Sequence, residues 1–133
     1  DKLNGLSLMD AYTIAGNKRF IGNVTAETDF LAPNTLVGFE NHSGLTYLEG
    51  DTKPLGMIII GNGNNGKDGF EGGRYKNVFG TYLHGSLLPK NPHFADYLIS
   101  LALEKRYGEK VELSKLDDEF EIDAHLSVAG KSY

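Results

Sequence analysis

The sequence predicts one domain of the α/β or α+β class, with antiparallel strands first and two helices last. Segments rich in β-branched and aromatic residues, separated by Gly, Asn and Pro turn signals, fill the chain up to about residue 83. Helical spacing of apolar residues begins only after residue 91. The length of 133 residues suits one compact domain and is too short for two.

Hairpins are expected in the first part of the chain. We predict a strand over residues 3–15, a turn at residues 16–18 (Gly-Asn-Lys) and a second strand over residues 19–28. A third strand is expected at residues 35–40, and residues 46–48 are expected to turn back and pair with it. The run Met-Ile-Ile-Ile at residues 57–60 predicts a short central strand, because it is apolar on both faces.

Residues 61–73 are rich in glycine and predict a mobile hairpin loop, which leads into a strand over residues 75–83. The loop contains a match to the dinucleotide fingerprint G-x-G-x-x-G at residues 61–66. That fingerprint needs a following helix whose N-terminal N–H groups bind the pyrophosphate. Because no helical pattern follows, we expect no nucleotide site.

Two helices are expected at the end of the chain. Asn91 can cap a helix and Pro92 suits its first position, while Gly108 marks its end. The buried face of this helix is predicted to hold Phe94, Tyr97, Leu98, Leu101 and Ala102. Ser114 and Asp117 resemble the start of a second helix. Its apolar stripe is predicted to be Leu116, Phe120, Ala124 and Val128.

Composition excludes several classes of protein. The net charge of −5 argues against a nucleic-acid-binding protein, which needs clustered Lys and Arg. The acidic residues at 117–123 predict a solvated helix face, with a docking surface as the alternative. No apolar run approaches the roughly 20 residues of a membrane helix. No secretory signal opens the chain, so we expect a cytoplasmic protein.

The chain contains no cysteine, which excludes disulfides, cysteine–metal sites and a cysteine nucleophile within these residues. The four histidines, His42, His84, His93 and His125, lack the spacing of a metal-binding pair, so we predict no metal. Ser43 and Ser86 do not stand in a Gly-x-Ser-x-Gly elbow. A serine hydrolase is therefore a weak alternative.

The candidate acid–base group is His84, which lies beside Gly85 at the end of the predicted 75–83 strand. Glu40 and His42 lie at the end of another predicted strand. If the two strands are neighbours, the three side chains converge at one sheet edge as a base, an orienting carboxylate and a second imidazole. The alternative is two unrelated strand ends, and no activated nucleophile is visible in the sequence.

Two segments resemble a known family. The run GTYLHGSLLPKNP at residues 80–92 is similar to the histidine segment of cobyric acid synthase-like (CobB/CobQ-like) class I glutamine amidotransferases. The run VGFENHSG at residues 37–44 resembles a second hallmark of that family, and the likeness extends from about Leu3 to about Ala124. The FENH run at residues 39–42 is most similar to the branch that holds the glutaminase subunit of lipid II isoglutaminyl synthase, which serves Gram-positive peptidoglycan synthesis.

The resemblance implies a flavodoxin-like α/β domain of which this chain is the C-terminal part. The cysteine-bearing elbow of such a domain lies N-terminal to the residues present, and the absence of cysteine and the start at Asp1 agree with this expectation. The cysteine thiolate attacks the side-chain amide of glutamine, and the family histidine, matched by His84, moves the protons. Glu40, Asn41 and His42 match the second segment and are expected to shape the substrate pocket or to orient groups within it.

Many class I relatives place a glutamate two residues after this histidine, where the present chain has Ser86. The third member of the catalytic triad is therefore open: it is absent, is Glu40, or comes from a partner. The implied ligand is L-glutamine, and the implied partners are the N-terminal part of the same domain and a synthetase that uses ATP and Mg²⁺. No cofactor is expected in this chain.

The acceptor of the amide is expected to be the glutamate of lipid II, with cobyric acid synthesis as the alternative. A non-catalytic docking or ligand-binding module is the other alternative, since this chain alone carries no thiol and is predicted to be inactive. We also predict that the chain self-associates or rearranges its sheet in isolation. The reason is that apolar edges such as residues 57–60 would then lack their neighbours.

Overall fold

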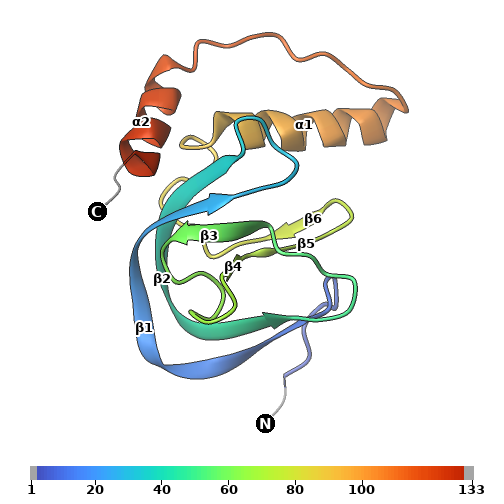
Figure 1. The fold of residues 1–133 in the computed structure, drawn as a ribbon. Coiled ribbons are helices and arrows are strands. Elements are labelled where there is room, and N and C mark those ends of the chain that lie inside the picture. The colour runs from blue at the N-terminus through green and yellow to red at the C-terminus, as the bar shows by residue number, and fades with distance from the viewer. Residues whose placement is uncertain (1–2, 131–133) are drawn as a thin grey trace.

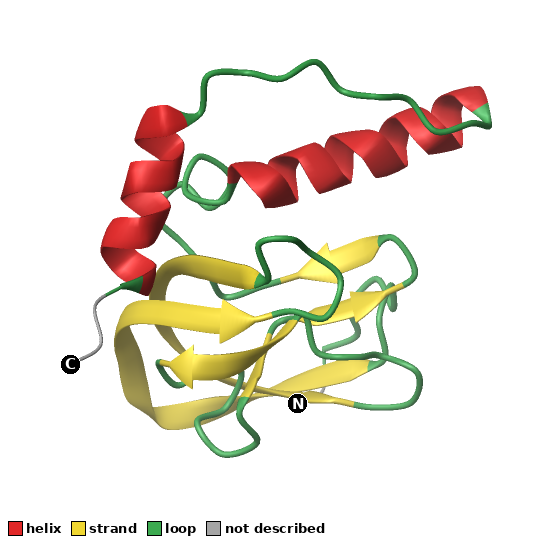
Figure 2. Ribbon diagram, turned by 45° about the horizontal axis from the view of Figure 1, so that its top comes forward, coloured by secondary structure: helices red, strands yellow, loops and turns green. Residues whose placement is uncertain are grey.

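The structure is a computed structural model that describes residues 3–130. A four-stranded antiparallel sheet has the order β2-β1-β3-β4, and β5 and β6 form a separate antiparallel pair. Two helices follow the strands and lie on one side of the curved sheets (Figures 1 and 2). The predicted order of antiparallel strands and then two helices is confirmed. The elements are β1 (Ala11–Glu27), β2 (Thr35–Leu48), β3 (Gly56–Ile60), β4 (Phe70–Glu71), β5 (Gly73–Tyr75), β6 (Val78–Gly80), α1 (Pro92–Tyr107) and α2 (Glu119–Ala129).

The long strands β1 and β2 form one hairpin, where the sequence predicted several short strands. They pair from Ala11 with Leu48 to Glu27 with Thr35, and the turn lies at residues 28–34. The turn predicted at residues 16–18 is instead an irregularity of the register between Ala15 and Phe20. Glycine is needed there because a β-carbon on Gly16 would collide with the carbonyl oxygen of Ser43. The predicted return strand at residues 46–48 is likewise wrong, since these residues continue β2 and pair with residues 11–13 of β1.

Two isolated bridges connect the edges of the sheets. Lys53 pairs with Arg74 of β5, and His84 pairs with Phe39 of β2. The outer edge of β2 is therefore partnered by the segment that follows β6. The fully buried core lies between this curved sheet and α1. Its members are Val24, Leu36, Leu55, Leu83 and Phe94.

β3 lies between β1 and β4, as predicted for a central strand. It is not buried on both faces, because Met57 and Ile59 are about half exposed. The glycine-rich loop after β3, which the sequence predicts to be mobile, is held by side-chain hydrogen bonds at Asn64 and Asn65. Asn64 Nδ2 donates to the carbonyl of Gly72, and Asn65 Nδ2 donates to the carbonyl of Thr46. The element that follows Gly66 is the strand β4, so the G-x-G-x-x-G run does not open a helix.

The strand predicted over residues 75–83 is a hairpin instead, since Tyr75 ends β5 and pairs with Val78 of β6 across a turn at residues 76–77. β6 ends at Gly80, and residues 81–83 have no regular structure. α1 runs from Pro92 to Tyr107, and Gly108 caps its end, as the sequence predicted; the φ of this glycine is left-handed at 77°. Asn91 occupies the N-cap position, as predicted, but its side chain makes no cap hydrogen bond. Of the predicted buried face of α1, only Phe94 is fully buried.

α2 begins at Glu119, and its predicted apolar stripe is wrong at Leu116 and Phe120, whereas Ala124 and Val128 are half-buried. Leu116 and Phe120 are 74% and 86% exposed, and the buried residue of this helix is His125. The helix docks through a polar side chain, which an apolar pattern does not reveal. Among residues 3–130, no helix has the length and apolar character needed to cross a bilayer.

Candidate active site around His84

His84 lies where a paired segment ends and the chain turns. Its N–H donates to the carbonyl of Phe39 (2.8 Å), and its carbonyl accepts from the Phe39 N–H (3.2 Å). The next two residues, Gly85 and Ser86, have φ of 76° and 61°, so the backbone bends sharply away from β2. The backbone of His84 is thus fixed on the sheet while its side chain is exposed to solvent.

The register on β2 separates Glu40 and His42 from His84. Residues directly opposite in an antiparallel pair share a face of the sheet, so the His84 side chain lies on the face of Phe39. Successive residues of a strand point to opposite faces, so Glu40 and His42 lie on the other face. Both are buried, with 1% and 8% exposure. The expected convergence of all three side chains is therefore not found, and only Glu40 and His42 come together.

Glu40 anchors the glycine-rich loop. Its Oε1 accepts from the Asn62 N–H (3.0 Å) and the Asn62 side-chain amide (2.6 Å), and its Oε2 accepts from the Gly63 N–H (3.0 Å). These donors occupy the lone pairs that would otherwise orient an imidazole. The carboxylate thus serves the loop between β3 and β4.

His42 packs between two aromatic rings. Its ring stacks on Tyr82 with centroids 3.6 Å apart, and it meets Phe20 edge-on at 5.5 Å. Nδ1 donates to the carbonyl of Gly44 (2.9 Å), because a carbonyl only accepts. Nε2 has no hydrogen-bond partner among the described residues and lies 3.9 Å from Glu40 Oε2. The imidazole supports Tyr82, two residues before His84.

A buried carboxylate that the sequence analysis missed is Glu71. Its Oε1 accepts from the Thr81 hydroxyl (2.6 Å) and the Tyr82 N–H (2.9 Å), and the side chain is fully buried. Burial raises the pKa of Glu71, and the two hydrogen bonds oppose that rise. Glu71 and His42 together hold residues 81 and 82, which form the approach to His84. No pattern in the sequence marks this contact, because it links the two-residue strand β4 to an irregular segment.

Asn41 lies on the face of β2 that also carries Phe39, and so on the face of His84. Its side-chain oxygen accepts from Arg19 Nε on β1 at 2.6 Å, and both residues are exposed. Arg19 was not singled out in the sequence, where it appeared only as the start of a strand. The pairing of β1 with β2 brings this guanidinium to the His84 face.

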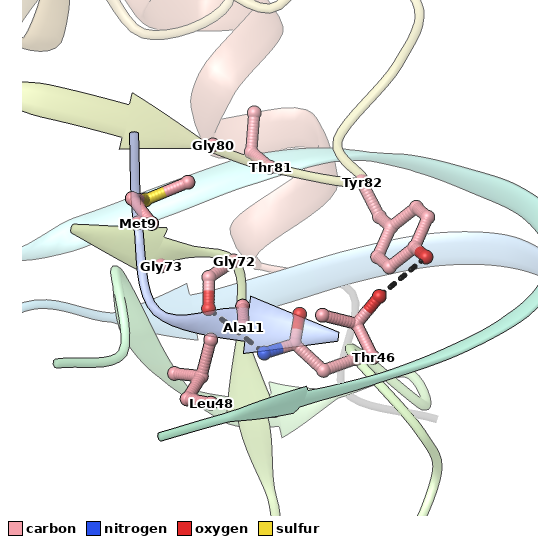
Figure 3. Close-up of a pocket in the computed structure, with 10 residues that line it drawn as sticks. Met9, Ala11, Thr46, Leu48, Gly72, Gly73, Gly80, Thr81 and Tyr82 are labelled. Atoms are coloured by element: carbon pink, nitrogen blue, oxygen red, sulfur yellow. Dashed lines mark hydrogen bonds between the residues drawn. The ribbon is translucent and has the colours of Figure 1, made fainter. Parts of the chain in front are cut away.

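The exposed imidazole of His84 is an acid–base group, and the chain contains no cysteine. Within residues 3–130, no group of three metal-ligating side chains is close enough to bind an ion. A small cavity of about 160 Å³ lies behind Tyr82 (Figure 3), whose hydroxyl is hydrogen-bonded to Thr46 Oγ1. None of His84, Glu40 and His42 lines it. The cavity therefore does not belong to the His84 face.

The sequence profile of the CobB/CobQ-like glutamine amidotransferase domain matches residues 1–92. The chain is 43% identical over 118 residues to the lipid II isoglutaminyl synthase (glutamine-hydrolyzing) subunit GatD of Streptococcus pneumoniae. That alignment covers 88% of this chain and 45% of the relative. The same subunit of Staphylococcus aureus is 45% identical over 123 residues, covering 92% of this chain and 49% of the relative.

A probable cobyric acid synthase of Methanothermobacter thermautotrophicus is 35% identical over 133 aligned residues, which cover 95% of this chain and 25% of the relative. The chain spans about half the length of the GatD relatives. The resemblance of residues 37–44 and 80–92 to this group of proteins is confirmed. The chain belongs to the CobB/CobQ-like glutamine amidotransferase family.

Proposed function

We propose that this chain is the histidine-bearing part of a glutaminase domain, which hydrolyses glutamine to glutamate and ammonia for an amide-forming synthetase. The observation that carries the proposal is the setting of His84. Its backbone is fixed on β2 by two hydrogen bonds, and its imidazole is exposed in a segment similar to the family's histidine motif. A general base needs this combination of fixed position and access to substrate.

The reaction uses a cysteine that this chain does not contain. We assign that thiol to residues corresponding to the half of the relatives that the chain does not cover. The thiolate attacks the side-chain amide carbon of glutamine, the C–N bond breaks, and a thioester forms. His84 gives a proton to the departing ammonia, then takes one from the water that hydrolyses the thioester. The products are glutamate, ammonia and the free thiol.

Substrate recognition on this face is assigned to Arg19 and Asn41. A guanidinium donates two parallel hydrogen bonds to a carboxylate, and glutamine carries one on its α-carbon. Asn41 accepts from Arg19 Nε, which fixes the direction of the guanidinium and leaves its terminal nitrogens available. Glu40 and His42 shape the site indirectly, through the loop at residues 61–66 and through Tyr82.

The acceptor that we propose is the glutamate of lipid II in peptidoglycan precursors. Two GatD subunits are 43% and 45% identical to the chain, whereas the cobyric acid synthase is 35% identical. The ammonia then passes to a partner synthetase that activates the acceptor with ATP and Mg²⁺. The flavodoxin-like sheet is completed by the N-terminal part of the domain, which also carries the thiol.

The test is glutamine hydrolysis by the protein in which this chain is joined to the cysteine-bearing part. We expect His84→Ala to lose two to four decades in kcat, about 3 to 5 kcal/mol of barrier, because the proton carrier is gone. The matched control is Ser86→Gly, which removes the nearby hydroxyl and suits the left-handed backbone at that residue. Unchanged activity in the control excludes Ser86 as a nucleophile, and normal activity in His84→Ala rejects the assignment.

The second candidate is a non-catalytic module that only docks a synthetase or binds a ligand. It is favoured by the absence of cysteine from the chain. Sequencing the gene upstream of Asp1 separates the candidates: a Gly-rich strand and elbow bearing a cysteine supports the enzyme. A protein without such a thiol, which binds a synthetase and hydrolyses no glutamine, supports the module.

A further inference from the structure

The outer edge of β2 is completed by a segment that is not a strand. Hydrogen-bonding groups of a strand recur on one edge at every second residue, and here these are residues 35, 37 and 39. Phe39 pairs with the backbone of His84. Val37 N–H donates to Asn91 Oδ1, and its carbonyl accepts from Asn91 Nδ2, both at 2.8 Å. The carbonyl of Thr35 accepts from His93 Nε2 at 2.8 Å. Residues 84–93 are thus attached to β2 at both ends.

α2 adds one contact to this segment through its buried residue. His125 is 5% exposed, and its Nδ1 donates to the carbonyl of Lys90 at 2.8 Å. Its Nε2 lies 2.9 Å from Thr35 Oγ1, and its ring meets that of His93 edge-on with centroids 5.2 Å apart. Because a carbonyl only accepts, Nδ1 carries hydrogen and both ring nitrogens are engaged. The helix therefore ties the last turn of the loop to the start of β2.

Lys90 transmits this contact toward His84. Its N–H donates to the carbonyl of Ser86 (3.4 Å), which closes the loop on itself. Its ammonium nitrogen lies 3.5 Å from the point where a β-carbon on Gly85 would stand. The backbone hydrogen bond to Ser86 couples the position of Lys90 to the turn at Gly85 and Ser86, which directly follows His84.

We propose that His125 is a positioning residue for His84. The hydrogen bond from its Nδ1 to the carbonyl of Lys90 lets the C-terminal helix set the conformation of the 84–91 loop and hence the direction of the His84 imidazole. The proposal rests on the function proposed for His84 as the proton carrier. The contact between Nε2 and Thr35 holds α2 against β2 but does not affect the position of His84.

Two substitutions separate the ring nitrogens of His125. The amide nitrogen of asparagine is as many bonds from the β-carbon as Nδ1, so His125→Asn keeps a donor for Lys90. The glutamine amide stands one bond further out, near Nε2, so His125→Gln keeps the contact with Thr35 and loses the one with Lys90. Leu126→Asn is the matched control, because it introduces the same amide at the next, 58% exposed position of the helix.

Glutamine hydrolysis is measured in the complete protein, with the urea midpoint of each variant. We expect His125→Gln to lower kcat about 10- to 100-fold with little change in KM, since a small misplacement of an acid–base group costs that much. The apparent pKa in its kcat/KM profile is expected to shift. His125→Asn and Leu126→Asn are expected to stay within about threefold of the parent. A variant that ends after Asp118 removes α2 altogether and is expected to match His125→Gln, which covers the case that the glutamine variant does not fold.

Equal kcat values for the Asn and Gln variants would overturn the proposal. Full activity in the protein lacking α2 would also overturn it. The same holds if the losses of kcat among the variants simply track their losses of stability, as given by the urea midpoints. Failure of the proposed function gives a different result, namely that His84→Ala itself retains activity. If His84→Ala is inactive while His125→Gln and the shortened protein are normal, His84 keeps its role and only the positioning by α2 is rejected.

Discussion

The face of β2 on which a residue lies decides which part of the structure its side chain contacts. Phe39 holds the backbone of His84, and its neighbour Glu40, on the opposite face, holds the glycine-rich loop. One strand therefore supports two parts of the site with consecutive residues. The sequence could place His84 at a bend, because the signal is local. The sequence could not show that Glu40 and His84 lie on opposite faces of the sheet, because this depends on which residue of a distant segment pairs with Phe39.

The buried carboxyl group of Glu71 is expected to make stability depend on pH. Its folded pKa is raised from the ordinary value of 4.5 by burial. The folded protein therefore binds this proton more tightly than the unfolded chain, and the contribution of Glu71 to stability is lost as pH rises from about 4.5 through the folded pKa. Glu71→Gln keeps an oxygen for Thr81 and Tyr82 and cannot ionise. As pH rises from 4.5 to 8, we expect the free energy of unfolding of Glu71→Gln to increase relative to that of the parent.

Urea unfolding across that pH range checks this expectation. The difference in unfolding free energy between Glu71→Gln and the parent can change by at most about 1.4 kcal/mol per pH unit, because only one group titrates. Glu104→Gln, on the exposed face of α1, is the control and should follow the parent at every pH. Parallel curves for Glu71→Gln and the parent would show that Glu71 does not titrate differently in the folded state.

Elements that depend on local signals were predicted well, and those that depend on distant partners were not. α1 begins at Pro92 and ends at Gly108, because proline and glycine act on their own backbone. Asn91 was expected to cap that helix, yet its carboxamide pairs with Val37, 54 residues away. The Gly-Asn-Lys signal at residues 16–18 is compatible with a turn or an irregular strand, and only the pairing of β1 with β2 decides between them.

The loop between β3 and β4 is expected to depend on the Glu40 carboxylate for its stability. Glu40→Gln replaces one carboxylate oxygen with an NH₂ group that faces the N–H donors of Asn62 and Gly63. A buried donor left without an acceptor costs about 1 to 3 kcal/mol, so we expect a loss of stability of that size. Hydrogen exchange should quicken at the amides of Asn62 and Gly63 more than in β1. Equal acceleration throughout the sheet would indicate general destabilisation and contradict a specific anchor.

The whole molecule pairs one edge of its sheet and leaves an apolar surface uncovered. Residues 84–93 complete β2, but Met57 and Ile59 on β3 stay 48% and 56% exposed. β4 pairs with Gly56 and Met57, and the N–H of Ile58 donates to the carbonyl of Gly69, so the exposed part of β3 is the face that carries Met57 and Ile59. Exposed apolar surfaces of this kind associate with other chains. The chain spans about half the length of its GatD relatives.

We therefore expect the isolated chain to self-associate through β3, although its net charge of −5 opposes close approach. Sedimentation velocity over a hundredfold range of concentration should show a rising average mass. Met57→Lys with Ile59→Lys should shift the sample toward monomer, because charges on an exposed strand oppose pairing with another chain. The control is Leu126→Lys, which places a lysine on exposed α2 and should leave association unchanged. A parent chain that stays monomeric at every concentration, or a control that also abolishes association, would rule out β3 as the contact.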